Sequence, residues 1–157
     1  MTAYMLDTNV FDRLLDKEVS IDAFRGRHLL ATHVQLEELE AAKKNYPERA
    51  ADLLSIFEEI DPKMHNTTSG LWDVSNWDQS DWSAKDGVVE NMLKRLRELD
   101  ALAGKKHRPK NAGRDVLIAH TAINIDAMLI SDDEPLRQLV SEFGGRTIPP
   151  SDLRTPE

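Results

Sequence analysis

Four acidic residues stand where apolar runs meet the ends of predicted strands or helices, and carboxylates in such places can hold a divalent cation. They are Asp7 in Leu-Asp-Thr-Asn, Glu38 in Gln-Leu-Glu-Glu-Leu, Asp115 in Gly-Arg-Asp-Val-Leu-Ile-Ala and Asp133 in Leu-Ile-Ser-Asp-Asp. Mg²⁺ and Mn²⁺ prefer carboxylate and water oxygens. Such ions polarise phosphoryl oxygens and generate hydroxide near neutral pH, so we expect metal-dependent hydrolysis of phosphodiester bonds.

Each acid also has an ordinary structural alternative. Asp7 could cap the helix that follows it, although the next two polar residues could cap it instead. Glu38 has glutamate neighbours, and a helical glutamate is usually a solvated surface charge. Asp115 suits the positive end of a helix dipole, and Asp132 or Asp133 could cap the helix that a proline opens. Asp132 could also take the place of Asp133 in a metal site. The ordered set therefore carries more weight than any one position.

Strand and helix patterns alternate along the chain. Short apolar runs predict strands at 3–6, 28–32, 127–130 and 146–148. Helical spacing predicts helices at 9–15, 35–44 with a start near Thr32 or His33, 47–60, 88–102, 112–125 and 135–143. This alternation indicates a three-layer α/β/α sandwich with a mostly parallel central sheet. Right-handed crossovers would bring the loops after residues 7 and 130 to one edge, where open parallel sheets bind ligands.

The chain is expected to form a single domain over residues 1–148, with an insertion at about 61–86 and a loosely held tail at 149–157. The insertion contains Trp72, Trp77 and Trp82, which recur every five residues and so fit neither a strand nor a helix face. We interpret it as an ordered loop, or a loop with short helical turns, anchored by its aromatics. Indoles that cover a core edge are favoured over indoles that stack on bases.

Composition bounds the cell compartment and the kind of metal ligand. The chain has 157 residues and no cysteine, so any metal must be held by oxygen or imidazole, and a reducing cytoplasm is the natural setting. No secretion signal or membrane-spanning stretch is apparent. The net charge of -8 repels a polyanion on average, but the segment from Lys105 to Lys110 is locally basic. Charge therefore neither favours nor excludes a nucleic-acid substrate.

The ordered acids and their flanking hydrophobic residues resemble the PIN-domain family. The matching segments are Met-Leu-Asp-Thr-Asn at 5–9, Thr-His-Val-Gln-Leu-Glu-Glu-Leu at 32–39, Arg-Asp-Val-Leu-Ile-Ala-His-Thr-Ala at 114–122 and Met-Leu-Ile-Ser-Asp-Asp at 128–133. The resemblance implies metal-binding or catalytic roles for Asp7, Glu38, Asp115 and Asp133. Asn9 and Ser131 match polar positions that shape such sites, and Thr8 belongs to the same motif.

The resemblance also implies an activity and partners. Many family members are ribonucleases directed at single strands, and many small bacterial ones are VapC-type toxins held in check by an antitoxin protein. The implied activity is Mg²⁺- or Mn²⁺-dependent endonucleolytic cleavage of single-stranded RNA. The resemblance also implies a homodimer. Lys110 and Arg114 are candidates for RNA binding because they lie just before Asp115.

Other α/β enzymes and other functions of the same fold are alternatives. Phosphatases of the haloacid-dehalogenase type need Asp-x-Asp after the first strand, whereas this chain has Asp-Thr-Asn at 7–9. No glycine-rich phosphate loop is present. A non-catalytic adaptor that binds RNA or protein, and a nuclease directed at DNA, remain as alternatives; loss of one or two acids would favour the adaptor.

Overall fold

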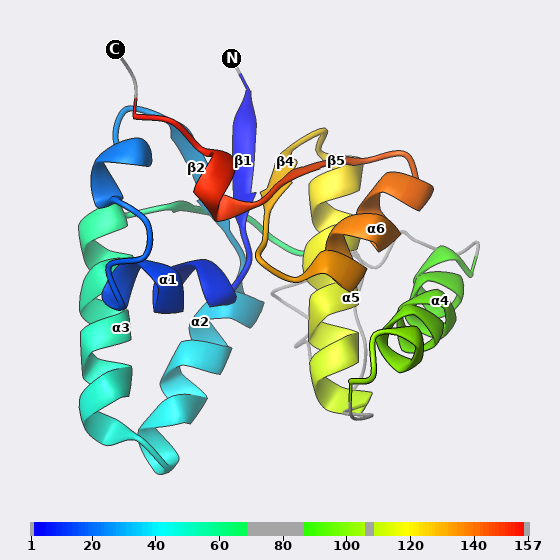
Figure 1. Cartoon of the computed structure of the whole chain (residues 1–157), viewed down its shortest axis with the longest axis horizontal. Helices are drawn as coiled ribbons and strands as arrows, with labels where there is room; N and C mark the ends of the chain where they lie inside the picture. The colour runs from blue at the N-terminus through cyan, green and yellow to red at the C-terminus, as the bar shows by residue number, and fades with distance from the viewer. Residues whose placement is uncertain (1, 69–86, 106–108, 156–157) are drawn as a thin grey trace.

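The computed structural model describes residues 2–68, 87–105 and 109–155, and only the backbone of residues 109–111. Its centre is a five-stranded parallel sheet in the order β3-β2-β1-β4-β5. The strands are β1 (Ala3–Leu6), β2 (His28–Ala31), β3 (Lys63–Met64), β4 (Met128–Ile130) and β5 (Arg146–Ile148). Since all of them run the same way, their carboxyl ends share one edge, the lower one in Figure 1.

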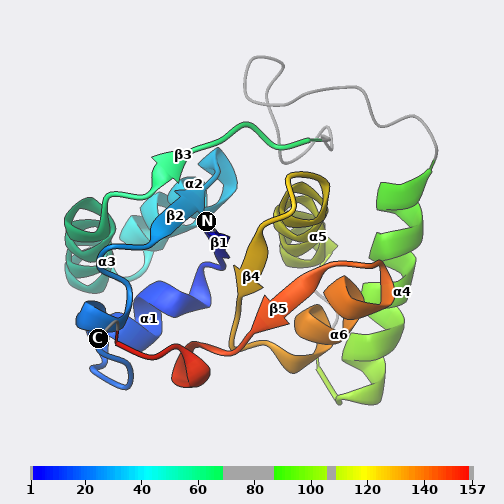
Figure 2. The same ribbon diagram turned by 90° about the horizontal axis from the view of Figure 1, so that it is seen from above.

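Helices cover both faces of this sheet, as the view from above shows (Figure 2). The helices are α1 (Asn9–Leu15), α2 (His33–Ala41), α3 (Pro47–Ile60), α4 (Val88–Leu102), α5 (Pro109–Asn124) and α6 (Glu134–Glu142). The predicted three-layer α/β/α sandwich is therefore confirmed, and the sheet is parallel throughout the described residues.

Alternate residues of the central strands feed two separate cores. Met5 and Leu129 pack with α4, α5 and α6, while their neighbours Leu6 and Ile130 pack with α1 and α3. This follows from the two-residue period of a strand, and it explains why these strands read as continuous apolar runs. Burial on both faces fixes the register of β1 and β4, and with it the position of the residues that follow them.

Helix boundaries follow recognisable local signals. Thr32 and Gln35 form a reciprocal capping box at the start of α2. Pro47 opens α3, and Asp61 ends it in a left-handed conformation with a φ of 51°. These signals explain why α2 and α3 begin, and α3 ends, where the sequence predicts.

Several details differ from the sequence-based expectation, among them the end of α2 at Ala41 instead of residue 44. The two-residue strand β3 was not predicted, because Lys63 and Met64 are exposed and pair with β2 through the backbone. Helix α5 begins at Pro109 instead of residue 112. Part of the tail that was expected to be loosely held packs against the domain. Leu153 is buried in the core beside α1 and α3, and Arg27 donates a hydrogen bond to the carbonyl oxygen of Arg154. The three tryptophans lie outside the described residues.

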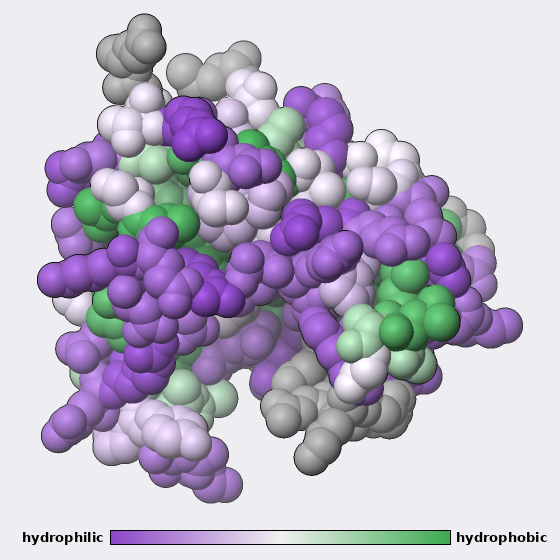
Figure 3. All heavy atoms as spheres, viewed as in Figure 1, coloured by the Kyte–Doolittle hydropathy of each residue, from purple (hydrophilic) through white to green (hydrophobic). Residues whose placement is uncertain are grey.

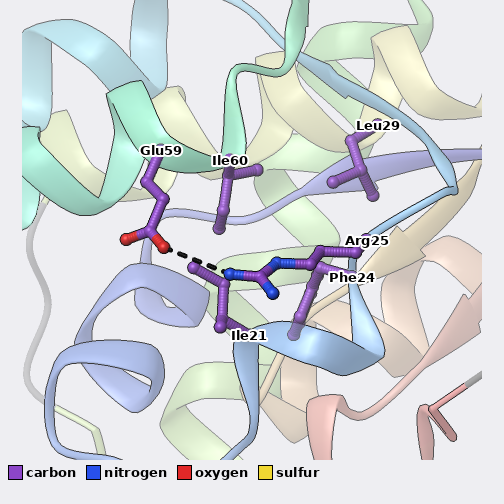
Figure 4. Close-up of a pocket in the computed structure, with 6 residues that line it drawn as sticks. All are labelled: Ile21, Phe24, Arg25, Leu29, Glu59 and Ile60. Atoms are coloured by element: carbon purple, nitrogen blue, oxygen red, sulfur yellow. Dashed lines mark hydrogen bonds and ion pairs between the residues drawn. The ribbon is translucent and has the colours of Figure 1, made fainter.

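A small pocket opens on the α3 side of the sheet (Figure 4). Its empty volume is about 220 Å³, part of which is open to solvent. Arg25 and Glu59 form an ion pair of 3.5 Å across it. Its lining residues are Ile21, Phe24, Arg25, Leu29, Glu59 and Ile60. None of them is among the predicted site residues.

Candidate functional site

The carboxyl ends of β1 and β4 bring Asp7 and Ser131 together. The two strands pair with Leu6 opposite Ile130, and the Asp7 amide donates to the carbonyl of Ile130 at 3.0 Å. The Ser131 hydroxyl donates to one carboxylate oxygen of Asp7 at 2.6 Å, and the Thr8 amide donates to the other at 2.8 Å. Asp7 is 4% exposed. Its carboxylate is thus held in one orientation at the sheet edge.

Helix α2 carries Glu38 to the same place. Gln35 ties the helix to β1, because its side-chain amide donates to the carbonyl of Leu6 at 2.8 Å while its oxygen accepts from the Thr32 amide at 2.8 Å. One turn later, Glu38 accepts a hydrogen bond from the Thr8 hydroxyl at 3.1 Å. Among the neighbouring glutamates that the sequence left as competitors, Glu38 is the one that contacts this motif.

Helix α5 supplies Asp115, which interacts electrostatically with Asp7, Glu38 and Asp133. It keeps partial contact with solvent but is densely surrounded by protein. Because α5 begins at Pro109, Asp115 lies beyond its first turn. The helix-dipole alternative for this residue is correspondingly weakened.

Asp133 and Asp132 point to different partners. The side chain of Asp133 caps α6 by accepting from the Leu136 amide at 3.3 Å, and it also forms an ion pair of 2.7 Å with Lys105. Asp132 pairs instead with Arg13. The structure therefore groups Asp133, and not Asp132, with the other three acids.

Burial and crowding raise the pKa values of Asp7, Glu38 and Asp115. Burial raises the pKa of Asp7 to about 6 despite its hydrogen bonds, and the charge of Asp133 adds to the rise. Burial, followed by the charge of Asp7, raises the pKa of Glu38 to about 7. Burial and the neighbouring carboxylates hold the pKa of Asp115 well above its usual range. Such a group has much to gain from a cation.

In Figure 3 the outline of the molecule is indented at its lower centre, and the coloured residues directly above the indentation are hydrophilic. This is the side toward which the strand carboxyl ends point in Figure 1.

Comparison with known proteins identifies the fold. No family model and no curated protein matches the sequence. A solved structure of DNA-bound VapBC from Salmonella typhimurium matches with a TM-score of 0.55 and 16% identity, covering 96% of this chain and 99% of that chain. VapBC2 from Rickettsia felis bound to a promoter DNA fragment matches with a TM-score of 0.53 and 16% identity, covering 94% of this chain and 98% of that chain. The chain has the PIN-domain fold. A domain of a functionally unknown protein from Methanocaldococcus jannaschii also matches, with a TM-score of 0.52 and 14% identity, covering 100% of this chain and 94% of that chain.

Two charged residues of this PIN fold escaped the sequence analysis. Asp100 at the end of α4 interacts electrostatically with Asp115 and Asp133, and burial raises its pKa. Lys105 forms its ion pair with Asp133. The sequence shows Lys105 only as the first residue of a basic segment, and the pairing spans residues too distant for any local pattern to reveal.

The two predicted RNA-binding residues have different outcomes. The side chain of Lys110 lies outside the described part of the chain. Arg114 interacts favourably with Glu38 and lowers its pKa against the effect of burial. The buried Nε atom of Arg114 has no hydrogen-bond partner among the described residues. Arg114 therefore lies at the acidic edge of the PIN fold with hydrogen-bonding capacity to spare.

The chemistry of the acids fits a hard divalent ion. Carboxylate oxygens are the preferred ligands of Mg²⁺ and Mn²⁺. The pKa values of Asp7, Glu38 and Asp115 are raised first by burial and then by neighbouring carboxylates, and a bound cation would offset both effects. As they stand, no three acidic or histidine side chains within the described ranges are close enough to hold one ion. Side-chain adjustment would have to accompany binding.

The helices of this chain were also compared with the length and polarity that a membrane-spanning helix needs. Within the described residues, every helix is too short or too polar to cross a bilayer.

Proposed function

We propose that this chain is a metal-dependent endoribonuclease of the VapC toxin type that hydrolyses phosphodiester bonds of single-stranded RNA. The observation that carries the proposal is the gathering of Asp7, Glu38, Asp115 and Asp133, each from a different element, at the carboxyl edge of a PIN-fold sheet. Carboxylates that lie close together repel one another, and a bound cation would compensate this repulsion. The VapBC structures support the toxin assignment through the shared fold.

The four acids would hold Mg²⁺ or Mn²⁺, which supplies Lewis-acid chemistry to the phosphoryl group and lowers the pKa of bound water. The chain's own polar residues orient the acids. Ser131 and the Thr8 amide hold the carboxylate of Asp7, while the Thr8 hydroxyl holds Glu38. Asn9 braces this arrangement, because its side-chain oxygen accepts from the Asp132 amide at 3.2 Å and its nitrogen donates to Ser131 at 3.5 Å.

Arg114 would serve the substrate. A guanidinium beside the acids can pair with a phosphate through more than one N–H. Its attraction to Glu38 places it at the edge of the cluster. Lys110, four residues earlier on α5, is proposed for the same role on sequence grounds.

The test is cleavage of labelled single-stranded RNA and DNA by purified protein in Mg²⁺, Mn²⁺ or EDTA. The proposal predicts cleavage of RNA in either metal, loss of cleavage in EDTA, and loss in an Asp7→Asn, Asp115→Asn double variant. Cleavage of DNA alone would indicate the DNA-directed alternative. Absence of both cleavage and metal binding would indicate an adaptor.

The toxin assignment has a separate test in cells. Expression of the wild type, but not of the double variant, should arrest bacterial growth, and co-expression of a cognate antitoxin should relieve the arrest. We propose a cytoplasmic site of action and a homodimer, which sedimentation of the purified chain would reveal. Undisturbed growth with active nuclease in the cells would contradict the toxin assignment while leaving the nuclease intact.

A further inference from the structure

Lys105 lies at the edge of the cluster of acids and contacts two of them. Its Nζ lies 2.7 Å from a carboxylate oxygen of Asp133 and 4.0 Å from one of Asp100. It also attracts the buried carboxylate of Asp7. The Asp133 side chain is 17% exposed, so this ion pair is partly shielded from solvent.

The end of α4 fixes where Lys105 stands. The Gly104 amide donates to the carbonyl of Ala101 at 3.1 Å, and the Lys105 amide donates to the carbonyl of Asp100 at 2.9 Å. This pair of bonds is the Schellman motif, and it needs the left-handed conformation that Gly104 adopts with a φ of 76°. The motif turns the chain back so that Lys105 faces the acids.

The local charge is far from balanced. The described acids that interact with one another here are Asp7, Glu38, Asp100, Asp115 and Asp133. The cations with a described interaction with this set are Lys105, at Asp7, Asp100 and Asp133, and Arg114, at Glu38. Lys105 is thus the cation positioned against the Asp133 side of the cluster.

We infer that Lys105 is an internal counter-cation that competes with the divalent ion for Asp133. The inference rests on the proposed function, since it requires that the acids bind a metal. An ammonium and a divalent ion held by the same carboxylate repel each other at short range, so the binding of one disfavours the other. Metal loading therefore displaces the Lys105 side chain from Asp133, and Lys105 weakens the affinity for the ion.

The first experiment is calorimetric titration of the full chain with Mn²⁺, without RNA, for the wild type, Lys105→Met, Lys105→Arg and Lys94→Met. Lys94 is an exposed residue of α4, the helix that precedes Lys105, and serves as the matched control. Lys105→Met should bind Mn²⁺ on the order of tenfold more tightly than the wild type. Lys105→Arg, which keeps the charge, and Lys94→Met should bind like the wild type.

A second measurement uses the wild type alone, so it does not depend on whether a variant folds. Isotopic reductive methylation of the wild type, read by mass spectrometry, should show that Mn²⁺ increases the reactivity of Lys105 and leaves that of Lys94 unchanged. Unchanged or slower methylation of Lys105, or unchanged or weaker Mn²⁺ binding by Lys105→Met, overturns the inference and leaves the proposed function standing. Absence of Mn²⁺ binding in every variant overturns both.

Discussion

The Ser131 hydroxyl donates a 2.6 Å hydrogen bond to the carboxylate of Asp7 and so joins the ends of two neighbouring strands. The same oxygen accepts from the Asp133 amide at 3.1 Å. One fully buried hydroxyl therefore sets both the orientation of the first acid and the start of the segment that carries the last one. Its removal should affect folding and metal binding together.

Ser131→Ala should lower the free energy of unfolding by about 1–2 kcal/mol, because it removes hydrogen bonds to a buried carboxylate and a partly buried amide. It should also weaken Mn²⁺ binding, since the Asp7 carboxylate loses one of its two fixed donors. Urea unfolding and Mn²⁺ titration measure the two effects. Ser55→Ala, on the exposed side of α3, is the control and should change neither. A wild-type Mn²⁺ affinity in Ser131→Ala would contradict the orienting role.

Asp7 should make the metal-free protein less stable as pH rises from about 4 to about 7. In the folded chain its pKa is about 6 instead of 3.8, so in this window the folded state keeps a proton that the unfolded state has released. The unfolded state then binds fewer protons, and stability falls with rising pH. A shift of this size corresponds to about 3 kcal/mol above pH 7.

Urea unfolding in EDTA between pH 4.5 and 8 measures this effect against Asp7→Asn. The variant should be more stable than the wild type at pH 8, by about 1 kcal/mol or more after loss of one hydrogen bond, and the difference should shrink toward pH 4.5. Asp52→Asn, at an exposed position of α3, should follow the wild-type profile. A constant difference between wild type and Asp7→Asn at all pH values would contradict the burial effect.

Gln35→Ala should cost about 2–4 kcal/mol, because it leaves the Leu6 carbonyl and the Thr32 amide without their partner inside the protein. It should also weaken Mn²⁺ binding, as Gln35 ties the helix of Glu38 to the end of β1. Urea unfolding and calorimetry provide the readouts. Glu40→Ala, an exposed change on the same helix, is the comparison. Equal stability of the two variants would show that this tie has no structural weight.

Sequence patterns predicted most of the fold because local signals and burial agree in this chain. Helix α4 was predicted with the bounds that the structure has, since its apolar residues keep a helical period throughout. Helix α5 was predicted to start late, although Pro109 suits a first helical turn. Strand β3 escaped because two exposed residues carry no alternation, and burial of Leu153 escaped because it stands alone in a polar tail.

The sequence placed the four acids near one another, whereas their role as metal ligands stays a prediction and their surroundings were not predicted. Two of the acids, Asp7 and Asp133, come after the ends of strands, and the other two, Glu38 and Asp115, lie on helices. A parallel sheet brings such positions to one edge. The pairing of Lys105 with Asp133 depends on how the end of α4 packs beside β4 and α6, which no local pattern encodes. The tie from Gln35 to Leu6 is likewise a tertiary contact, although the capping-box spacing marks Gln35 in the sequence.

Cleavage of single-stranded RNA in Mg²⁺ by the wild type, Glu38→Gln and Glu37→Gln tests the central claim most directly. Glu38 contacts the Asp7-Thr8 motif, whereas its neighbour Glu37 has the same chemistry without that contact in the described structure. The account predicts that Glu38→Gln cleaves RNA on the order of 100-fold more slowly than the wild type and that Glu37→Gln cleaves normally, all activity ending in EDTA. Equal activity of Glu38→Gln and Glu37→Gln, or activity that survives EDTA, would contradict it.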